Sequence, residues 1–556
     1  MYVPNFRLPP LLATYLFFGW FSIFPQILFY TTGVTGWSGL RDALLYSNVW
    51  FLVPALLSGP VLTRVMLLIA GAMGICSLAK FGNFMVFGQE LSQSVFVATM
   101  ETNPGEAAEF FQHFVKWWMP VLGVLYVLPM IWFYRHAHKG SLTRKQRITL
   151  ISIVSIFFIQ PFVSQATTEK ATKRIKQRFE TVEPWSMALN YYAYQANLAE
   201  STQMVANMEA ISKDAVVKNN DNTEEQTYVL VLGESTSRER LSLYGYPRKT
   251  NPELETIRDE LLLYTDVAAV IPYTIESLSS TLSFTDPENL KDVYHEMNVI
   301  TLMKKVGFKT FWITNQQTLS GRNTLLTALA NLTDEQVFLN NNRRQSAASY
   351  DDVVLAPFDK ALHDPAPKKL IIVHLIGAHF AYEYRYPESA AVFNDSNVPT
   401  KVALSPEEVK VYNQYDNAIH FNDHVVHSLI ELYRKQDPYG FLLYFADHGE
   451  EVFDNRNWNG RSMTDPTPQM YDVPFMLWPA PKWAATQDMA ALRATTSRPG
   501  THRNFLHGWC DIARISFDKC DPSLSLFGKD YKPAPRFVGT GSDKHSYDDV
   551  KKKYQR

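Results

Sequence analysis

Four side chains of this protein have the types and the order along the chain that a divalent metal site requires. Glu234 follows one apolar run in a GEST segment, and Asp447 and His448 follow another in an ADHGE segment. Between them along the chain, Thr274 lies in a PYTIES segment. Two carboxylates, one imidazole and one alcohol can complete a four-coordinate zinc site. A divalent metal favours the alkoxide form of an alcohol and screens negative charge on a phosphate. We therefore expect a metal-dependent enzyme that acts on a phosphoester, with Thr274 as the nucleophile.

Other polar residues near these motifs have both a structural and a functional interpretation. Glu234 could cap a helix and Thr274 could be a turn hydroxyl, although the position of Thr274 between the two motifs favours catalysis. His374 lies inside an apolar run, where a hydrogen-bonded core histidine is expected. His379 follows that run in a Gly-Ala-His motif and is a candidate functional residue.

A third polar segment, ITNQQTLSGRN, contains candidate phosphate ligands. Asn315, Gln316 and Arg322 lie in it, and the guanidinium of Arg322 offers a fork of donors to phosphate oxygens. A surface loop without a ligand is an equal alternative for this segment.

Composition divides the chain into two unlike parts. Its 556 residues include 53 Lys and Arg against 55 Asp and Glu, a formal net charge of −2, so nothing points to nucleic acid. The mean hydropathy of −0.15 is an average over two parts. Long uncharged runs dominate residues 1–168, whereas the remainder is ordinary polar globular sequence.

Five uncharged runs in the first part are long enough to be membrane spans. A helix needs about 20 residues to cross a hydrocarbon core of roughly 30 Å. A tight turn at Ser58-Gly59-Pro60 is expected within the second and third runs, which together are too long for one span. The predicted spans are Leu11–Tyr30, Ala43–Thr63, Val65–Ala79, Trp117–Tyr134 and Ile148–Ser164.

The loop charges predict the orientation of these spans. Residues Arg135–Arg147, between the fourth and fifth spans, include five Lys or Arg and no acid. The positive-inside rule places such a loop in the cytoplasm. The amino terminus is then cytoplasmic, and everything after the fifth span lies outside the cytoplasm.

The remainder of the chain consists of a linker, residues 169–226, and an α/β domain, residues 227–556. Glu169–Glu180 is charged and predicts a helix that leaves the membrane surface. Further along, continuous apolar runs alternate with helical patterns, which predicts a mostly parallel sheet covered on both faces. The predicted strands are residues 228–232, 310–313, 370–373, 441–445 and 473–478. Ligands of such sheets bind beyond the carboxyl ends of the strands, so the polar residues that follow each run are expected to converge.

Four segments resemble the phosphoethanolamine transferases of the alkaline phosphatase superfamily. They are VLVLGESTSRERLSLYGYPRKTNP, PYTIES, HLIGAHFAYEYRYP and ADHGEE. A five-span membrane domain followed by an external domain also matches that family, so the resemblance covers nearly the whole chain. DHG alone would indicate only the superfamily. The branch that modifies the lipopolysaccharide inner core looks most similar.

The resemblance implies a function, a cofactor and a location. Phosphoethanolamine would move from phosphatidylethanolamine to lipopolysaccharide core, lipid A or another envelope acceptor through a covalent intermediate on Thr274. One zinc ion would be held by Glu234, Thr274, Asp447 and His448, with His379 beside it. The protein would cross the bacterial inner membrane several times and place an alkaline-phosphatase-like catalytic domain in the periplasm. A phosphoester or sulfate ester hydrolase, and a non-catalytic envelope-binding protein, stay open as alternatives.

The chain departs from this family in one segment. Many relatives carry a further histidine after the DHG motif, whereas Asn455–Tyr471 contains none. We therefore expect one zinc ion rather than two, and phosphate contacts from Asn457, Asn459 or Arg461 instead.

The cysteines are few, namely Cys76, Cys510 and Cys520. Relatives that act on lipid A are usually rich in disulfides in this domain, whereas this chain can form one at most. An oxidising compartment permits a Cys510–Cys520 bridge. If Cys510 lies on a helix over Asn504–Ile515, however, the two Cα atoms could be too far apart. The sequence leaves this bridge open.

Overall fold

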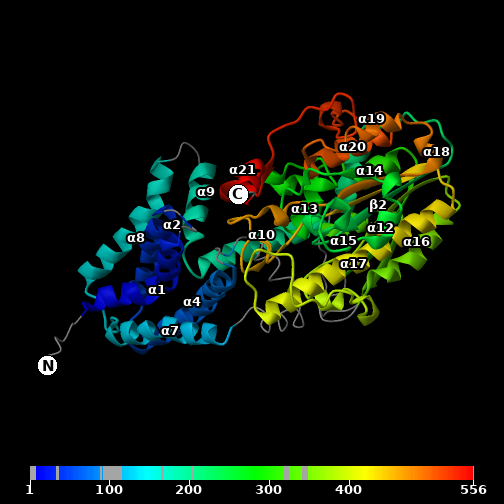
Figure 1. Ribbon diagram of the computed structural model, residues 1–556. Helices are drawn as coiled ribbons and strands as arrows, with labels where there is room; N and C mark the ends of the chain where they lie inside the picture. The colour runs from blue at the N-terminus through cyan, green and yellow to red at the C-terminus, as the bar shows by residue number, and fades with distance from the viewer. Residues whose placement is uncertain are drawn as a thin grey trace. The chain divides into compact units, whose positions relative to one another are not determined.

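The fold is described from a computed structural model that covers residues 8–32, 35, 37–87, 91, 116–164, 168–202, 204–213, 215–317, 325–340 and 349–554. Two compact units follow one another along the chain, and the boundary between them falls between Ala196 and Asn197. Figure 1 shows the first, the N-terminal unit, in blue and cyan, and the second, the C-terminal unit, from green to red.

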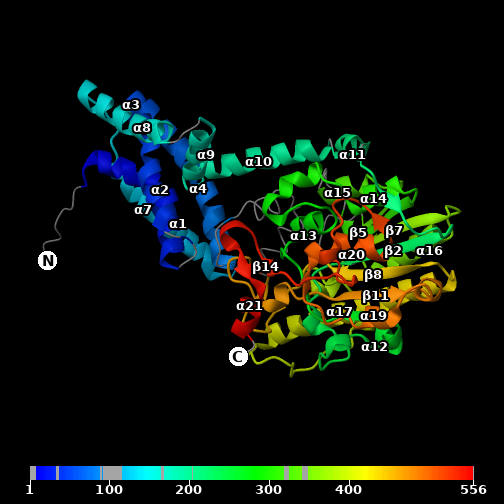
Figure 2. The same ribbon diagram turned by 90° about the horizontal axis from the view of Figure 1, so that it is seen from above.

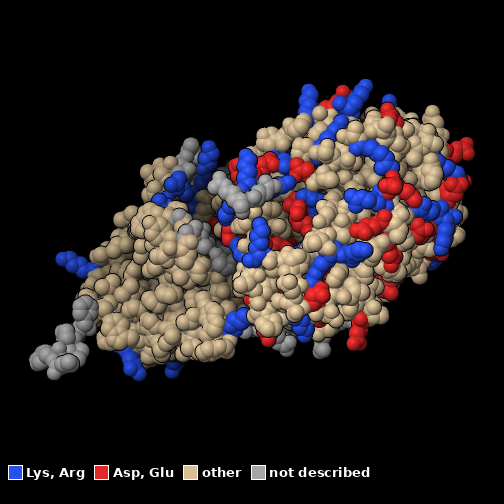
Figure 3. Space-filling model, in the orientation of Figure 1, with Lys and Arg blue, Asp and Glu red and all other residues tan. Residues whose placement is uncertain are grey.

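The N-terminal unit is helical, and four of its described helices are long and apolar enough to cross a membrane. Large apolar side chains such as Leu68, Ile75 and Val124 are exposed on them, as expected of lipid-facing helices. On the face drawn in Figure 3, broad uncharged surface covers this unit, at the left of the view. The four helices are α1 (Pro10–Thr31), α4 (Gly59–Phe87), α7 (Trp118–His136) and α8 (Arg144–Ser164).

The prediction of five separate long spans is not confirmed, because the second one is divided. The residues of Ala43–Thr63 belong to four elements: α2 (Trp37–Tyr46), η1 (Ser47–Phe51), α3 (Leu52–Leu56) and the start of α4. Of these, α4 alone is long enough to be a span. The predicted turn lies where α4 begins, since Gly59 has a φ of 60° and Pro60 takes the next helical position. Residues 59–63 therefore extend the predicted third span rather than the second.

A buried ion pair joins two segments of the N-terminal unit. Lys80 on α4 lies 2.8 Å from Glu183, and the two side chains are only 4% and 1% exposed. Glu183 lies between α9 (Thr168–Phe179), which matches the predicted linker helix, and α10 (Trp185–Thr202). Its backbone N–H also donates to Ser22 of α1 at 2.9 Å. The pair therefore fixes the segment that follows α9 against α1 and α4.

The C-terminal unit contains a seven-stranded sheet in the order β3-β11-β8-β2-β7-β5-β6. All five predicted strands are present, and the four pairings from β8 to β6 are parallel. The last predicted strand, β11, instead runs antiparallel to β8. Two further strands, β3 and β6, were not expected. The strands are β2 (Gln226–Gly233), β3 (Leu262–Tyr264), β5 (Lys309–Gln317), β6 (Glu335–Asn340), β7 (Lys368–His374), β8 (Gly440–Ala446) and β11 (Phe475–Pro479).

Two hydrophobic cores cover the two faces of this sheet. Figure 2, the ribbon seen from above, shows helices on both sides of the strands. Alternate residues of β2 enter different cores, for example Leu230 one and Val231 the other. The first core also contains residues of α13 (Thr274–Thr281), α14 (Val299–Lys305) and α20 (Phe505–Ile512). The second contains residues of α16 (Leu355–Leu362) and α17 (Pro406–Lys435). Burial on both faces explains why these strands are continuously apolar.

The register of the central strands brings the two main motifs together. β2 and β8 are parallel neighbours in which Gly233 pairs with Ala446. The next residues, Glu234 and Asp447, therefore leave the sheet side by side at its carboxyl edge. This placement agrees with the predicted convergence of polar residues.

A disulfide links α20 to the chain that follows it. Cys510 and Cys520 are bonded, with their Cα atoms 6.3 Å apart. Because α20 ends at Ile512, the chain turns back soon enough for the two residues to meet. Cys76, on α4, is a free cysteine.

Candidate metal and phosphoryl-transfer site

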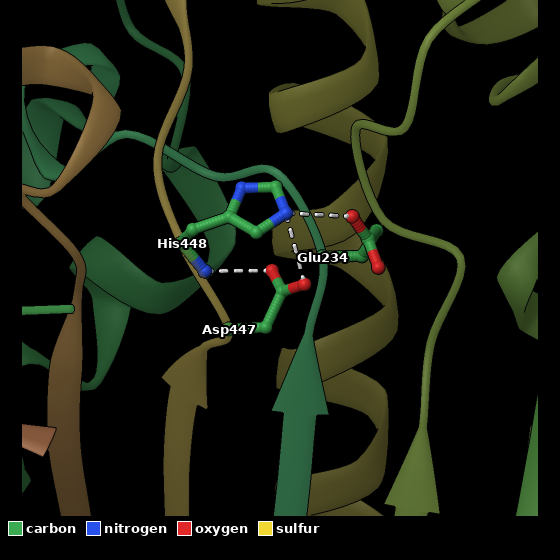
Figure 4. A group of neighbouring side chains, drawn as sticks. All are labelled: Glu234, Asp447 and His448. Carbon is green, nitrogen blue, oxygen red and sulfur yellow. Dashed lines mark hydrogen bonds and ion pairs between the residues drawn. The ribbon is translucent and has the colours of Figure 1, made fainter. Parts of the chain in front are cut away.

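Three fully buried side chains form a group of possible metal ligands at the carboxyl edge of β2 and β8 (Figure 4). His448 Nε2 lies 3.1 Å from Asp447 Oδ2 and 3.4 Å from Glu234 Oε1. One ligand atom from each residue lies within 4.8 Å of the others. The two carboxylates and one imidazole thus face a common point.

The hydrogen bonds of this group leave its inward-facing atoms available to a metal. Asp447 Oδ1 accepts from the backbone N–H groups of Ser235 at 3.0 Å and His448 at 2.7 Å. Its Oδ2 is buried with no hydrogen-bond partner among the described residues. His448 Nδ1 donates to the Gly449 carbonyl at 2.9 Å, which leaves a lone pair on Nε2. These residues fit zinc, which commonly takes such nitrogen and oxygen ligands.

Thr274, the predicted nucleophile, lies against this group. It is the first residue of α13, and its Oγ1 lies 3.1 and 3.0 Å from the two carboxylate oxygens of Glu234. The same oxygen is 3.3 Å from His448 Nε2. Thr274 is only half-buried, whereas the three other residues are fully buried. Thr274 is therefore the most accessible of the four residues.

Unusual backbone positions hold Glu234 in place. Ser235 has a φ of 52°, which is rare for a residue other than glycine, and its Oγ donates to Glu234 Oε1 at 2.7 Å. Gly377 has a φ of 52° as well, and a Cβ there would lie 2.6 Å from the Glu234 carbonyl oxygen. Strain of this kind collects at functional sites, where the surrounding structure enforces it.

The other predicted site residues differ in whether they contact this group. Gln316 Nε2 donates to Glu234 Oε2 at 3.1 Å, so its amide contacts the metal-ligand group directly. Asn315 is fully buried, and its amide donates to Asp351 at 2.9 Å. His379 follows β7; burial lowers its pKa to about 3, and its Nδ1 has no partner among the described side chains. Arg322 lies outside the residues that the structure describes. Roles of these residues in binding phosphate or in proton transfer stay predictions.

The electrostatics around the group favour a cation. Burial opposes the charge on Arg461, yet the carboxylates of Glu450 and Glu234 raise its pKa above the ordinary value. A site that stabilises this cation has an excess of negative charge, which suits a divalent ion.

Two supporting residues were not found by sequence reasoning. Ser277, one turn after Thr274 on α13, donates to the Asp447 carbonyl at 2.6 Å. His502 Nδ1 lies 3.4 Å from that serine hydroxyl. The spacing of Thr274 and Ser277 on one helix face was a usable signal, since side chains three residues apart are neighbours. His502 carried none, because it lies far from the motifs in the sequence.

Comparison with known proteins gives concordant results. Residues 226–515 match the sulfatase family. Phosphoethanolamine transferase EptC of Escherichia coli is 37% identical over 542 residues, which are 96% of this chain and 94% of that protein. Phosphoethanolamine transferase CptA of Salmonella typhimurium is 37% identical over 544 residues, with the same two coverages.

Two solved structures are similar as well. The C-terminal periplasmic domain of EptC from Escherichia coli, in complex with Zn, has a TM-score of 0.58 and 44% identity, covering 60% of this chain and 96% of that one. The integral membrane protein lipooligosaccharide phosphoethanolamine transferase A from Neisseria meningitidis has a TM-score of 0.63 at 17% identity, covering 93% and 96%. At that identity the second likeness concerns the fold alone, and it extends over both units.

Proposed function

Because the chain belongs to the phosphoethanolamine transferases of the alkaline phosphatase superfamily, we propose that it transfers phosphoethanolamine from phosphatidylethanolamine to an acceptor of the cell envelope. The acceptor would be lipopolysaccharide, at its core or at lipid A. The observation that carries the proposal is the position of Thr274 Oγ1, which lies against Glu234 and His448 with one side open.

We propose zinc as the metal, held by Glu234, Asp447, His448 and Thr274. A relative's periplasmic domain in complex with Zn supports this choice, as does Asp447 Oδ2, which accepts no hydrogen bond from the described residues. When bound, zinc would favour the alkoxide form of the Thr274 hydroxyl and screen charge on the phosphoryl group. Gln316 would hold the Glu234 carboxylate in place for the metal, because its amide donates to Glu234 Oε2.

In the first half-reaction, Thr274 Oγ1 attacks the phosphorus of the donor lipid. A bond forms between Oγ1 and phosphorus, and the bond from phosphorus to the glycerol oxygen breaks. The hydroxyl proton moves first to the Glu234 carboxylate, which already accepts it at 3.0 Å, and ends on the released diacylglycerol. The product is a phosphoethanolamine ester of Thr274.

In the second half-reaction, an acceptor hydroxyl attacks the same phosphorus and Thr274 Oγ1 leaves. His379 is our candidate base for this step, because its imidazole lies close enough to Glu234 and His448 to interact electrostatically with both, and its Nδ1 has no hydrogen-bond partner among the described residues. The proton that His379 takes from the acceptor hydroxyl passes to Thr274 Oγ1 as it leaves, and the acceptor carries the phosphoethanolamine group.

We also propose that the helices of the N-terminal unit anchor the protein in the bacterial inner membrane and that the C-terminal unit lies in the periplasm. The α2-η1-α3 segment would be the remaining span of the predicted five. The four apolar helices, the basic loop Arg135–Arg147 and the periplasmic domain of the E. coli relative support this arrangement.

A lipid assay with the full-length protein in mixed micelles tests the function. With phosphatidylethanolamine and lipopolysaccharide supplied together, we expect diacylglycerol and a modified acceptor. Free phosphoethanolamine would instead indicate a hydrolase, and the absence of both products would indicate a binding protein.

A further inference from the structure

Arg461 occupies a position that bears directly on metal binding. Its Nη1 donates to His448 Nε2 at 2.6 Å and lies 3.9 Å from Glu234 Oε1. Both of those atoms belong to the group that faces the common point described above. The guanidinium therefore contacts two of the proposed metal ligands at their ligand atoms.

Two short strands place Arg461 there. β9 (Glu451–Val452) and β10 (Asn459–Gly460) form an antiparallel pair in which Gly460 pairs with Glu451. Arg461 and Glu450 are the next residues on the two strands, and Arg461 Nε lies 4.0 Å from Glu450 Oε1. The side chain of Arg461 is 20% exposed, whereas that of Glu450 is 2% exposed. Arg461 thus approaches the group from its more exposed side, and the buried carboxylate of Glu450 lies beside the guanidinium.

The present contact and a bound metal exclude each other. His448 Nε2 has one lone pair, since Nδ1 donates to the Gly449 carbonyl. That lone pair can accept from Arg461 or bind a metal, but not both. A guanidinium at this range would also repel a divalent ion, because Arg461 keeps its charge at any pH of interest.

The displaced guanidinium has a second set of partners within reach. Glu450 lies beside it, and one of the Glu450 oxygens has no hydrogen-bond partner among the described residues. One edge of an arginine fork can pair with a carboxylate while the other binds phosphoryl oxygens. Because Thr274 is the open side of the same group, a phosphoryl group placed for attack would lie next to Arg461.

We propose that Arg461 exchanges partners when the metal binds. Without the metal its guanidinium holds His448 and Glu234; with the metal it pairs with Glu450 and binds the nonbridging oxygens of the phosphoryl group. The metal part stands on geometry alone, whereas the phosphoryl part rests on the proposed function.

The first test measures zinc affinity of the full-length protein by competition with a chelator. Arg461→Gln should bind zinc at least about tenfold more tightly than the unmodified protein, because a competing contact and a like charge are both removed. Arg456→Gln is the matched control: it removes an arginine of the same segment that pairs with Asp465 at the surface. Its zinc affinity should not change. If Arg461→Gln does not fold, Arg461→Met carries the same comparison, since methionine retains much of the aliphatic stem.

The second test uses inorganic phosphate as the probe on the zinc-loaded protein. Phosphate should raise the unfolding temperature of the unmodified protein and of Arg456→Gln. Arg461→Gln should lose that shift, and Arg461→Lys should recover part of it, since lysine supplies the charge without the fork.

Equal or weaker zinc binding by Arg461→Gln would overturn the exchange, and an unchanged phosphate shift would overturn the phosphoryl contact. Neither readout requires transfer activity. A protein that releases no diacylglycerol but gives both expected results would therefore contradict the proposed function and not this inference.

Discussion

The hydroxyl of Thr274 lies within 3.1 Å of both carboxylate oxygens of Glu234. Thr274 begins α13, whereas Glu234 directly follows β2. In the proposed reaction, this fully buried carboxylate would take up the proton of the half-buried hydroxyl as the hydroxyl oxygen attacks. Gln316 donates to the same carboxylate, which fixes its orientation toward Thr274.

Substitutions of Thr274 should show whether its hydroxyl oxygen is the nucleophile. Thr274→Ala removes the attacking oxygen, so we expect at least about a 10³-fold loss of diacylglycerol release. Thr274→Ser keeps the oxygen but loses the methyl group that restricts its rotamer, so part of the activity should remain. Mass spectrometry of protein incubated with phosphatidylethanolamine should find phosphoethanolamine on the peptide that contains Thr274. An adduct on another residue would identify a different nucleophile.

Asp447 Oδ2, which accepts no hydrogen bond from the described residues, predicts how the metal is held. Elemental analysis of the purified protein should find about one zinc per chain, and Asp447→Asn should lose most of it because a neutral amide is a weaker ligand than a carboxylate. Asp437→Asn, which changes an exposed carboxylate paired with Lys482, is the control and should retain the zinc. Full zinc content in Asp447→Asn would mean that this oxygen is not a ligand.

Gly377 should be sensitive to a single added methyl group. Gly377→Ala places a Cβ 2.6 Å from the Glu234 carbonyl at a φ of 52°, so the backbone under Glu234 must move. We expect weaker zinc binding and an unfolding free energy lower by about 2–3 kcal/mol. Gly541→Ala has a similar φ of 59° with no atom within 4 Å of the added Cβ, so it measures the conformational effect alone. Equal effects of the two substitutions on zinc affinity would show that the contact with Glu234 is unimportant.

The elements that carry the site were predictable where burial produces a clear pattern. The five predicted strands are continuously apolar because both faces of the sheet are covered, and they were all found. β3 was missed because it has only three residues, and β6 because none of its first five residues is fully buried. The turn at Ser58-Gly59-Pro60 was predicted, but the division of residues 43–57 into α2, η1 and α3 was missed because these residues are as apolar as those of a span.

The convergence of Glu234 and Asp447 could be predicted, but the position of Arg461 could not. Glu234 and Asp447 follow strands that pair in register, so a strand pattern was enough to bring them together. Arg461 depends on β9 and β10, which have two residues each and no apolar alternation. Contacts made by such short strands depend on tertiary packing that a local pattern does not contain.

The pH dependence of stability should include a contribution from Asp423. Burial raises its pKa from 3.8 to about 7, although the backbone N–H groups of Glu253 and Leu254 donate to it. The folded state then binds the proton more tightly than the unfolded state, so stability falls as the pH rises from about 4 to about 7. Asp423→Asn does not titrate, so the unfolding temperature of the variant minus that of the unmodified protein should increase from pH 5 to pH 8. A difference that is the same at both pH values would refute the assignment.

The buried pair of Lys80 and Glu183 predicts strong coupling in the N-terminal unit. Lys80→Met leaves a buried carboxylate without its countercharge and should lower the unfolding free energy by about 3–5 kcal/mol. The double substitution Lys80→Met with Glu183→Leu should be close to neutral, because no charge remains to be compensated. A thermal unfolding comparison of both single variants and the double variant in detergent would measure the coupling. Additive effects would mean that the two side chains act independently.

Because Cys510 and Cys520 form a disulfide, the number of free thiols in the chain depends on the compartment in which its C-terminal unit folds. The sequence contains three cysteines, so a bonded molecule has a single reactive thiol, Cys76. Chains whose C-terminal unit stays in a reducing compartment would keep three. Counting alkylated thiols in unfolded protein from whole cells would thus report membrane orientation molecule by molecule, without any fused reporter domain.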